Sequence, residues 1–172
     1  MFQGTTAFYN ISSLILTEID QALQATSFGS VARVCVVPGE FAWDECECGT
    51  LAASPQRFFF SDEFPEGALG RGLVRTSVCD LPWIVADILF IIARCAPQPT
   101  SPGLAPPCED LAAAAQVLLS DASVVMRETA RVLCELTANG DIIDYVMGDQ
   151  ITQGPAGACV GTQLQVFVAV ER

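Results

Sequence analysis

The chain has 172 residues, 51% of them apolar, and a net charge of −12. This length suits one domain with a sizeable core, and the apolar fraction argues against a disordered chain. All eight basic residues are arginines, since the sequence contains neither lysine nor histidine. Nucleic-acid affinity is built mainly from basic groups, so we expect no tight grip on DNA or RNA. An acidic surface can nevertheless lie beside DNA, because it repels the duplex and keeps it from sticking.

The absence of histidine and lysine also excludes most of the common catalytic arrangements of enzymes. Without histidine there is no Ser–His or Cys–His nucleophile and no histidine metal site. Without lysine there is no Schiff base and no Walker lysine. Asp62 and Glu63 could in principle form an acid–base pair, but adjacent acids in a loop are far more often solvated. We therefore expect no enzyme activity and no cofactor.

No targeting or membrane segment is visible in the sequence. The first ten residues lack a basic region followed by an apolar run, so they do not resemble a secretory signal. The most apolar run, residues 81–93, is shorter than the roughly 20 residues that span a bilayer, and it contains Asp87. We expect a soluble protein inside the cell, without membrane contact, where thiols stay reduced.

The first predicted element is an amphipathic helix over residues 10–25, with Asn10 as its N-cap. Its apolar face is formed by residues four positions apart: Ile11, Ile15, Ile19 and Leu23. Gly29 ends the helical pattern. The β-branched residues that follow predict a strand over residues 30–37, which ends at Pro38-Gly39.

Two further segments precede the centre of the chain. Residues 40–54 are predicted to form a second strand or a turn region, and residues 56–64 a third short strand. The loop Ser61–Gly72 is rich in glycine and acid, too polar for the core and too long for a tight hairpin. Loops of this kind are often either functional or disordered, so we consider this one a candidate contact arm.

The middle of the chain is first apolar and then rich in proline. Residues 80–95 are apolar on both faces, which predicts a central strand covered on both sides or paired against a neighbouring subunit. Residues 96–107 contain five prolines and predict a long extended loop inside one domain.

A long helix is predicted over residues 108–136. Glu109 and Asp110 lie in its first turn, where the helix dipole favours acids. Arg131 and Glu135 are spaced to pair on its outer face. One continuous apolar stripe is expected to face the core: Leu111, Ala115, Leu118, Ala122, Val125, Met126, Thr129, Leu133 and Leu136.

The chain closes with a predicted hairpin, in which residues 141–153 run to a turn at 154–157 and residues 158–171 return. Gln163 and Gln165 share one face of the returning strand. The other face is apolar or β-branched: Val160, Thr162, Leu164, Val166, Val168 and Val170. The order of elements predicts a single α+β domain over residues 1–172. Its mixed or antiparallel sheet would be flanked by an N-terminal helix and one long central helix.

Eight cysteines raise the question of metal or redox chemistry. The only close pair, Cys46 and Cys48, lies in the acidic stretch DECECGTL and lacks the second pair that a thiolate zinc site requires. Most of the others, such as Cys35, Cys134 and Cys159, are expected to be buried free thiols that act as small apolar residues. We expect no bound metal, although a zinc site and a disulfide stay open as alternatives.

Several short patterns, taken in order, resemble the tail terminator proteins of long-tailed phages that infect actinobacteria. They are CVVPGEFAWDECECGTL from residue 35, SDEFP from residue 61, CDLPWIVADILFIIARCAP from residue 79 and GPAGACVGTQLQVFVAV from residue 154. A long alanine-rich helix precedes the last of them. The resemblance covers nearly the whole chain, and it depends on the ordered set rather than on any single motif.

The resemblance implies an α+β protomer that assembles as a homo-hexameric ring in the tail–neck region of the virion. Such a ring caps the finished tail tube, stops polymerisation of the tube protein and docks to the head-to-tail connector or stopper protein. DNA would pass through the lumen without specific binding, which suits an acidic wall. Assembly would take place in the cytoplasm of the host bacterium.

For such a ring we expect the loop Ser61–Gly72, including Asp62, Glu63, Phe64 and Glu66, to contact the tail tube or an adjoining ring. A solvated loop without a partner is the alternative. Other functions also stay open. The chain could be another neck or tail ring protein, such as a head–tail stopper, an adaptor or a tube subunit. Outside that class, it could be a thiol-based metal-binding or redox module.

Overall fold

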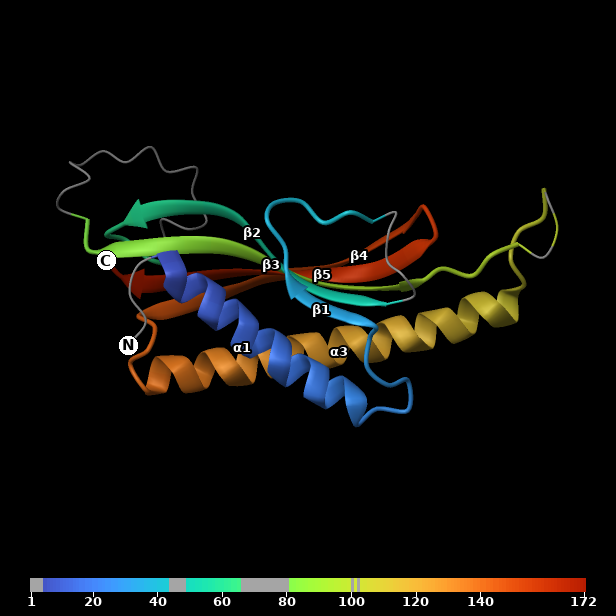
Figure 1. The fold of residues 1–172 in the computed structure, drawn as a ribbon, viewed down its shortest axis with the longest axis horizontal. Helices are drawn as coiled ribbons and strands as arrows, with labels where there is room; N and C mark the ends of the chain where they lie inside the picture. Colours follow the sequence, from blue (N-terminus) through green and yellow to red (C-terminus); the bar gives the residue numbers. More distant parts are fainter. Residues whose placement is uncertain (1–4, 44–48, 66–80, 100, 102) are drawn as a thin grey trace.

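The structure is a computed structural model that describes residues 5–43, 49–65, 81–99, 101 and 103–172 (Figure 1). These residues form one α+β domain with a five-stranded mixed sheet and two helices, as the sequence predicts. The elements in chain order are α1 (Thr5–Gln24), β1 (Arg33–Val36), β2 (Thr50–Ser61), β3 (Trp83–Cys95), α3 (Cys108–Ala138), β4 (Asp144–Ala156) and β5 (Cys159–Glu171).

The sheet is built around β3, in the strand order β1-β2-β3-β5-β4. β1 runs parallel to β2, whereas all other neighbouring strands are antiparallel. β3 pairs with β5 along its whole length, from Trp83 opposite Glu171 to Cys95 opposite Cys159. The prediction of a central strand is therefore confirmed for residues 83–95, and the closing hairpin is confirmed as well.

β2 is continuous from Thr50 to Ser61, whereas the sequence predicts a strand or turn region over residues 40–54 and a separate short strand over residues 56–64. The expected break falls at Pro55, which has no backbone N–H to donate to a neighbouring strand. The strand nevertheless continues, because its register with β3 shifts between Pro55 and Arg57. A bulge at this point accommodates the proline and keeps both halves paired.

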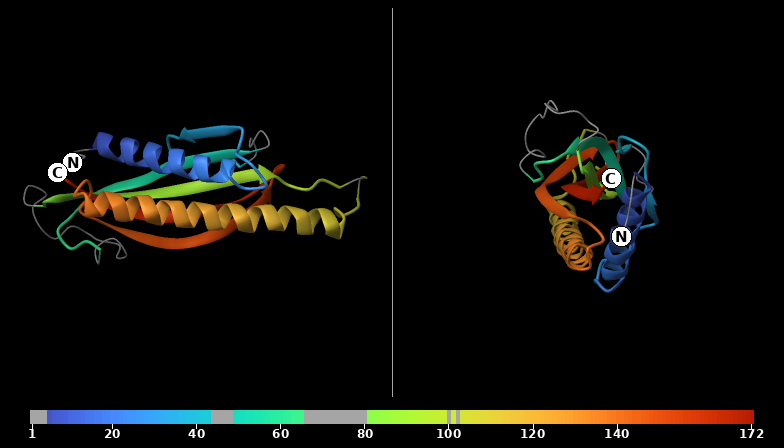
Figure 2. Two further views of the ribbon diagram at one scale, coloured as in Figure 1. Left: turned by 90° about the horizontal axis from the view of Figure 1, so that it is seen from below. Right: turned by 90° about the vertical axis from the view of Figure 1, so that its left-hand side faces the viewer.

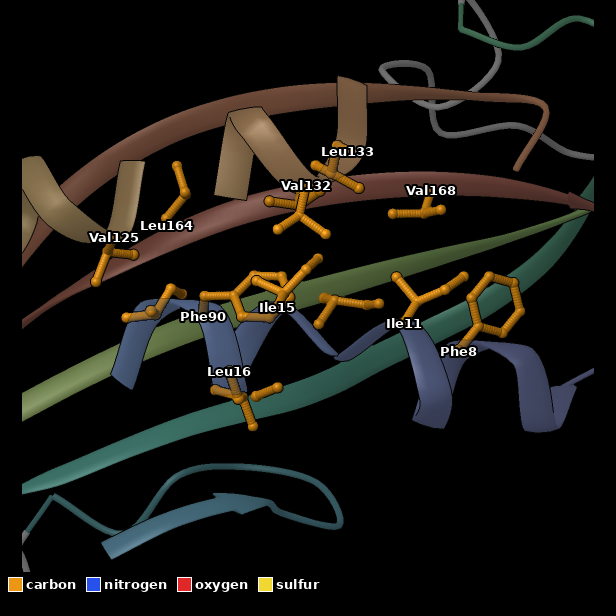
Figure 3. Packing of buried hydrophobic residues seen from close by; sticks show 14 of the residues in the cluster. Phe8, Ile11, Ile15, Leu16, Phe90, Val125, Val132, Leu133, Leu164 and Val168 are labelled. Carbon is orange, nitrogen blue, oxygen red and sulfur yellow. The ribbon is translucent and has the colours of Figure 1, made fainter. Parts of the chain in front are cut away.

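α1 and α3 lie on the same face of the sheet, where they cover the main hydrophobic core (Figure 2). The predicted apolar face of α1 is fully buried there: Ile11, Ile15, Ile19 and Leu23. The prediction that Asn10 caps this helix is wrong, because α1 begins at Thr5. Ala7 and Phe8 extend the buried face toward the start of the helix, which explains its greater length. Figure 3 shows side chains from both helices and from the sheet gathered in this layer.

α3 extends past the sheet and past α1 at its amino-terminal end (Figures 1 and 2). Its buried residues lie only from Asp121 onward. Leu111 is 46% exposed and Met126 is 45% exposed, so the prediction of one continuous core stripe holds only in part. Periodicity identifies the apolar face of a helix but not the point at which the neighbouring layer ends. The predicted ion pair between Arg131 and Glu135 is present at 2.8 Å.

The opposite face of the sheet, here called the outer face, carries two small apolar clusters near the two ends of β3. The cluster near the start of β3 contains Val85, Phe167 and Ala169, with Phe59, Phe64 and Val146 packed against them. The cluster near its end contains Ala93 and Cys159, with Phe41 and Trp43 packed against them. The stretch of sheet between the two clusters carries most of the polar side chains of this face, with Leu89 and Ile151 among them.

Candidate functional site

The polar stretch of the outer face forms a hollow of about 390 Å³, here called the outer trough. It is lined by residues of four strands: Gln56, Asp87, Leu89, Asp149, Ile151, Gln163 and Gln165. A second hollow of about 220 Å³ adjoins it and shares Gln56, Leu89 and Gln163. Glu40 is among the residues that line this second hollow.

Strand alternation explains why polar groups meet here. On β3, Ile88 and Phe90 point into the core, so the residues between and beside them face outward. On β5, Leu164 and Val166 belong to the core, which places Gln163 and Gln165 on the outer face. The predicted division of faces in the last strand is therefore confirmed. Asp87 stands opposite Phe167 and beside Gln165, so an acid from the middle of an apolar strand lies among amides.

Asp87 is the most buried charged group of the trough, at 7% exposure. The Nε2 of Gln165 donates a hydrogen bond to its Oδ1 at 3.0 Å. The Nη2 of Arg57 lies 3.6 Å from its Oδ2, which is longer than a direct charge-assisted hydrogen bond of about 2.7–2.9 Å. The guanidinium of Arg57 also lies 5.1 Å from the ring centroid of Phe59, within cation–π range. A buried carboxylate needs such partners, because burial of an isolated charge is costly.

Other polar groups of the trough keep unused hydrogen-bonding capacity. The amide nitrogen of Gln56 donates to the backbone oxygen and the hydroxyl of Ser54. Within the described part of the chain, the side chains of Asp149 and Gln163 have no hydrogen-bond partner. Asp149 is exposed and Gln163 is half-buried. The trough therefore presents carboxylate and amide groups that a ligand could bond.

The apolar cluster that contains Ala93 and Trp43 packs closely against the backbone at Gly161. A Cβ at this position would overlap the carbonyl oxygen of Ile92 and lie 2.9 Å from the ring of Trp43. The absence of a side chain at Gly161 leaves room for the Trp43 ring, which lines the adjoining hollow. The ring of Phe41 packs edge-on to Trp43 at 5.0 Å.

The predicted contact loop is described only up to residue 65. Asp62 and Glu63 are exposed at the end of β2, and the backbone N–H of Glu63 donates to the hydroxyl of Ser61 at 3.2 Å. Phe64 is half-buried, because it packs against the outer-face cluster around Val85. Glu66 and the rest of the loop to Gly72 lie outside the described residues. The contact role of this loop stays a prediction.

The prediction of buried free thiols is wrong for the described cysteines, since Cys35 is only half-buried and Cys95 and Cys108 are exposed. Cys159 is buried and disulfide-bonded, so the prediction that it is a free thiol is wrong. Cys134 is exposed rather than buried, and its Sγ lies 2.9 Å from the hydroxyl of Tyr145. This contact and partial burial raise the pKa of Tyr145. Cys46 and Cys48 lie outside the described residues. The described residues contain no group of three or more cysteine, aspartate or glutamate side chains that could hold a metal ion.

A further hollow lies where α3 extends beyond the sheet, and we call it the proline groove. It measures about 270 Å³ and is lined almost entirely by apolar residues: Ala96, Pro97, Pro106, Leu111, Ala114, Ala115, Leu118, Pro155 and Val160. Leu119, one residue beyond it on α3, is 68% exposed. The sequence predicts the proline-rich connector and the helix, but the groove between them arises only when both pack beside the β4–β5 turn.

Comparison of the chain with known protein families and with curated proteins finds no match. No helix in the described part of the chain is both long enough and apolar enough to cross a bilayer.

Proposed function

We propose that the protein is a tail terminator of a long-tailed phage, which ends the tail tube with a homo-hexameric ring and joins it to the head connector. The observation that carries this proposal is the ordered set of residue patterns between Cys35 and Val170, which resembles that family along nearly the whole chain. The single α+β domain with a mixed sheet and two helices agrees with the fold that the resemblance implies.

The exposed apolar surfaces give this proposal further support. A ring is formed by heterologous contacts, in which two different surfaces of each copy meet. The chain has apolar surface at both ends of its long axis. One end carries the proline groove and Leu119, and the other carries Tyr9, which is 61% exposed, and Phe58, which is 49% exposed. Large exposed apolar residues gathered in one place often mark an interface.

The charge of the chain agrees with a DNA passage. A net charge of −12 disfavours binding of the phosphate backbone. DNA that moves from head to tail must pass through the ring without binding to it. An acidic lumen surface suits this, because it repels the phosphate backbone. In this proposal the partners are further copies of the chain, the tail tube protein and the head-to-tail connector, and the protein is located in the neck of the virion.

The test is an assembly experiment with purified protein. Native mass spectrometry should detect a hexamer, and addition of the protein to polymerising tube protein should fix tube length. A tube subunit would instead stack without limit on its own. A stopper or adaptor would form a ring that binds the connector but leaves tube growth unchanged, and either result would replace the proposal by that alternative.

The disulfide at Cys159 favours one second candidate, a thiol-based redox or metal-binding module. Thiol counting before and after mild reduction, together with metal analysis of the purified protein, tests it. Stoichiometric zinc, or a disulfide that opens and closes at cellular redox potentials, would support this candidate. A disulfide that mild reductants leave intact in metal-free protein would eliminate it.

A further inference from the structure

We propose that the outer trough is a binding site for a guanidinium group, supplied by an arginine side chain of a partner protein. This inference goes beyond the proposed function, since it depends on the trough of a single copy and not on ring formation. It rests on three observations: the balance of acceptors in the trough, the loose ion pair of Asp87, and the apolar walls beside the acids.

Apart from Gln163, whose amide can both donate and accept, the polar groups of the trough mainly offer acceptors and so favour a ligand that donates hydrogen bonds. The carboxylate oxygens of Asp87 and Asp149 can only accept hydrogen bonds. Gln165 uses its amide nitrogen on Asp87, so its amide oxygen is left to accept. Gln56 uses its nitrogen on Ser54, so it too offers an oxygen. A guanidinium carries five N–H donors and no acceptor, and it therefore complements this set.

The geometry around Asp87 shows that a guanidinium fits beside it. Arg57 already places its guanidinium over Phe59, but its Nη2 stays 3.6 Å from Oδ2 of Asp87. The Arg57 side chain is 48% exposed. Oδ2 therefore keeps capacity for a shorter charge-assisted bond from a second donor, and Arg57 competes with that donor for the same oxygen.

The shape of the trough favours arginine over a small cation. Leu89 and Ile151 provide apolar surface in the same hollow, and Ile151 is 45% exposed. The aliphatic stem of an arginine can lie along such surface while its charged end reaches the carboxylates. A planar guanidinium also presents its donors in several directions within the hollow that Asp87 and Asp149 line, whereas an ammonium group is a point charge.

The test uses the full chain and three blocked tripeptides: acetyl-Gly-Arg-Gly-amide and its lysine and citrulline analogues. Citrulline keeps the shape of arginine but lacks its charge. In an NMR titration, the arginine peptide should shift the side-chain amide signals of Gln163 and Gln165 in a saturable manner. The citrulline peptide should bind at least about tenfold more weakly, and the lysine peptide should fall between them.

Three variants make the test specific. Asp149→Asn, at an exposed position, should weaken arginine binding several-fold without affecting the fold. Arg57→Gln should strengthen it, because the competing internal guanidinium is removed. Glu109→Gln removes an exposed acid of α3 and serves as the matched control, which should leave binding unchanged. Far-UV circular dichroism establishes that each variant is folded.

Two results would overturn the proposal. One is equal binding of the arginine and citrulline peptides. The other is an equal loss of affinity in Asp149→Asn and Glu109→Gln, which would mean that the peptide responds only to the overall negative charge. Neither result depends on the oligomeric state, so failure here is distinguishable from failure of the tail-terminator proposal.

Discussion

Arg94 donates two hydrogen bonds to the carboxylate of Asp121, from Nε at 2.8 Å and from Nη2 at 3.1 Å. Asp121 is fully buried on α3, and Arg94 lies near the end of β3. The same guanidinium donates to the backbone oxygens of Gly29 and Ser30 in the segment after α1. One side chain therefore ties the central strand, the long helix and the α1–β1 connection together.

Removal of one partner of this pair should destabilise the protein strongly. Asp121→Ala leaves a mostly buried guanidinium without its carboxylate, and we expect a loss of about 3–5 kcal/mol in the free energy of unfolding. Chemical denaturation measures this loss. The double variant Arg94→Met with Asp121→Leu should recover much of it, because both buried charges are gone. A loss below about 1 kcal/mol for Asp121→Ala would show that the pair contributes no more than a surface ion pair.

Glu128 should make the stability depend on pH. Hydrogen bonds from Arg131 and Arg127 lower the pKa of its carboxyl below the ordinary 4.5. The carboxylate therefore stabilises the fold above about pH 4.5, and this contribution disappears as the pH falls through the lower pKa of the folded state. Glu128→Gln should cost about 0.5–1 kcal/mol at pH 7 and less at pH 3. Denaturant melts at both pH values check this, and a difference independent of pH would contradict it.

Gly161→Ala should lower the stability of the protein by disrupting the packing of the outer face. The added methyl group would overlap the carbonyl oxygen of Ile92 and press on Trp43, so β3 and β5 would have to move apart. Overpacking of this kind costs about 1–3 kcal/mol. The fluorescence of Trp43 should change together with the melting temperature. Thr152→Ala, at an exposed site on the neighbouring strand β4, is the control and should stay within about 0.5 kcal/mol of the wild type.

Variants at the start of the predicted contact loop can distinguish a packing role from a role in partner contact. Phe64→Ala should lower stability by about 1–3 kcal/mol, because Phe64 packs on the cluster around Val85. Asp62→Ala with Glu63→Ala should leave stability unchanged, since both side chains are exposed. If the loop contacts the tail tube, this double variant should give tails of irregular length in a complementation assay. Normal infectious particles would argue for a solvated loop.

A substitution at Leu119 tests whether the apolar surface at the amino-terminal half of α3 is part of the ring interface. Leu119→Glu exchanges an exposed apolar residue for a good helix former, so the monomer should keep its stability. Ring formation should nevertheless fail, as size-exclusion chromatography with light scattering would show. Leu14→Glu, at a 38% exposed position on α1, is the matched control and should still assemble. Assembly of both variants would exclude this surface from the interface.

The sequence predicts the elements whose signals are local. The four-residue spacing on α1, the apolar run of β3 and the alternation of β5 all correspond to the observed faces. Local sequence patterns fail to predict the structure where tertiary contacts determine the length of a strand or the burial of a helix face. Pro55 predicts a break that a bulge removes, and the stripe of α3 contains Leu111, which no layer covers.

The outer trough could be predicted only in part. Asp87 inside an apolar run is a visible anomaly, and Gln163 and Gln165 are placed on one face by alternation. Their meeting with Asp149 requires the strand order β3-β5-β4, which long-range pairing sets. A disulfide is an alternative that the sequence leaves open, but its connectivity, and hence the involvement of Cys159, cannot be deduced from spacing.

The uneven burial of α3 means that one continuous helix should not behave as one cooperative unit. Its turns from Asp121 onward contribute buried side chains, whereas the preceding turns have no buried residue and border the proline groove. Amide hydrogens in those first turns should exchange with solvent through local fraying, and those near Leu133 only through global unfolding. Occupation of the proline groove by a partner would slow exchange in the first turns alone. The change in amide-exchange protection along α3 would therefore show whether a partner occupies the proline groove.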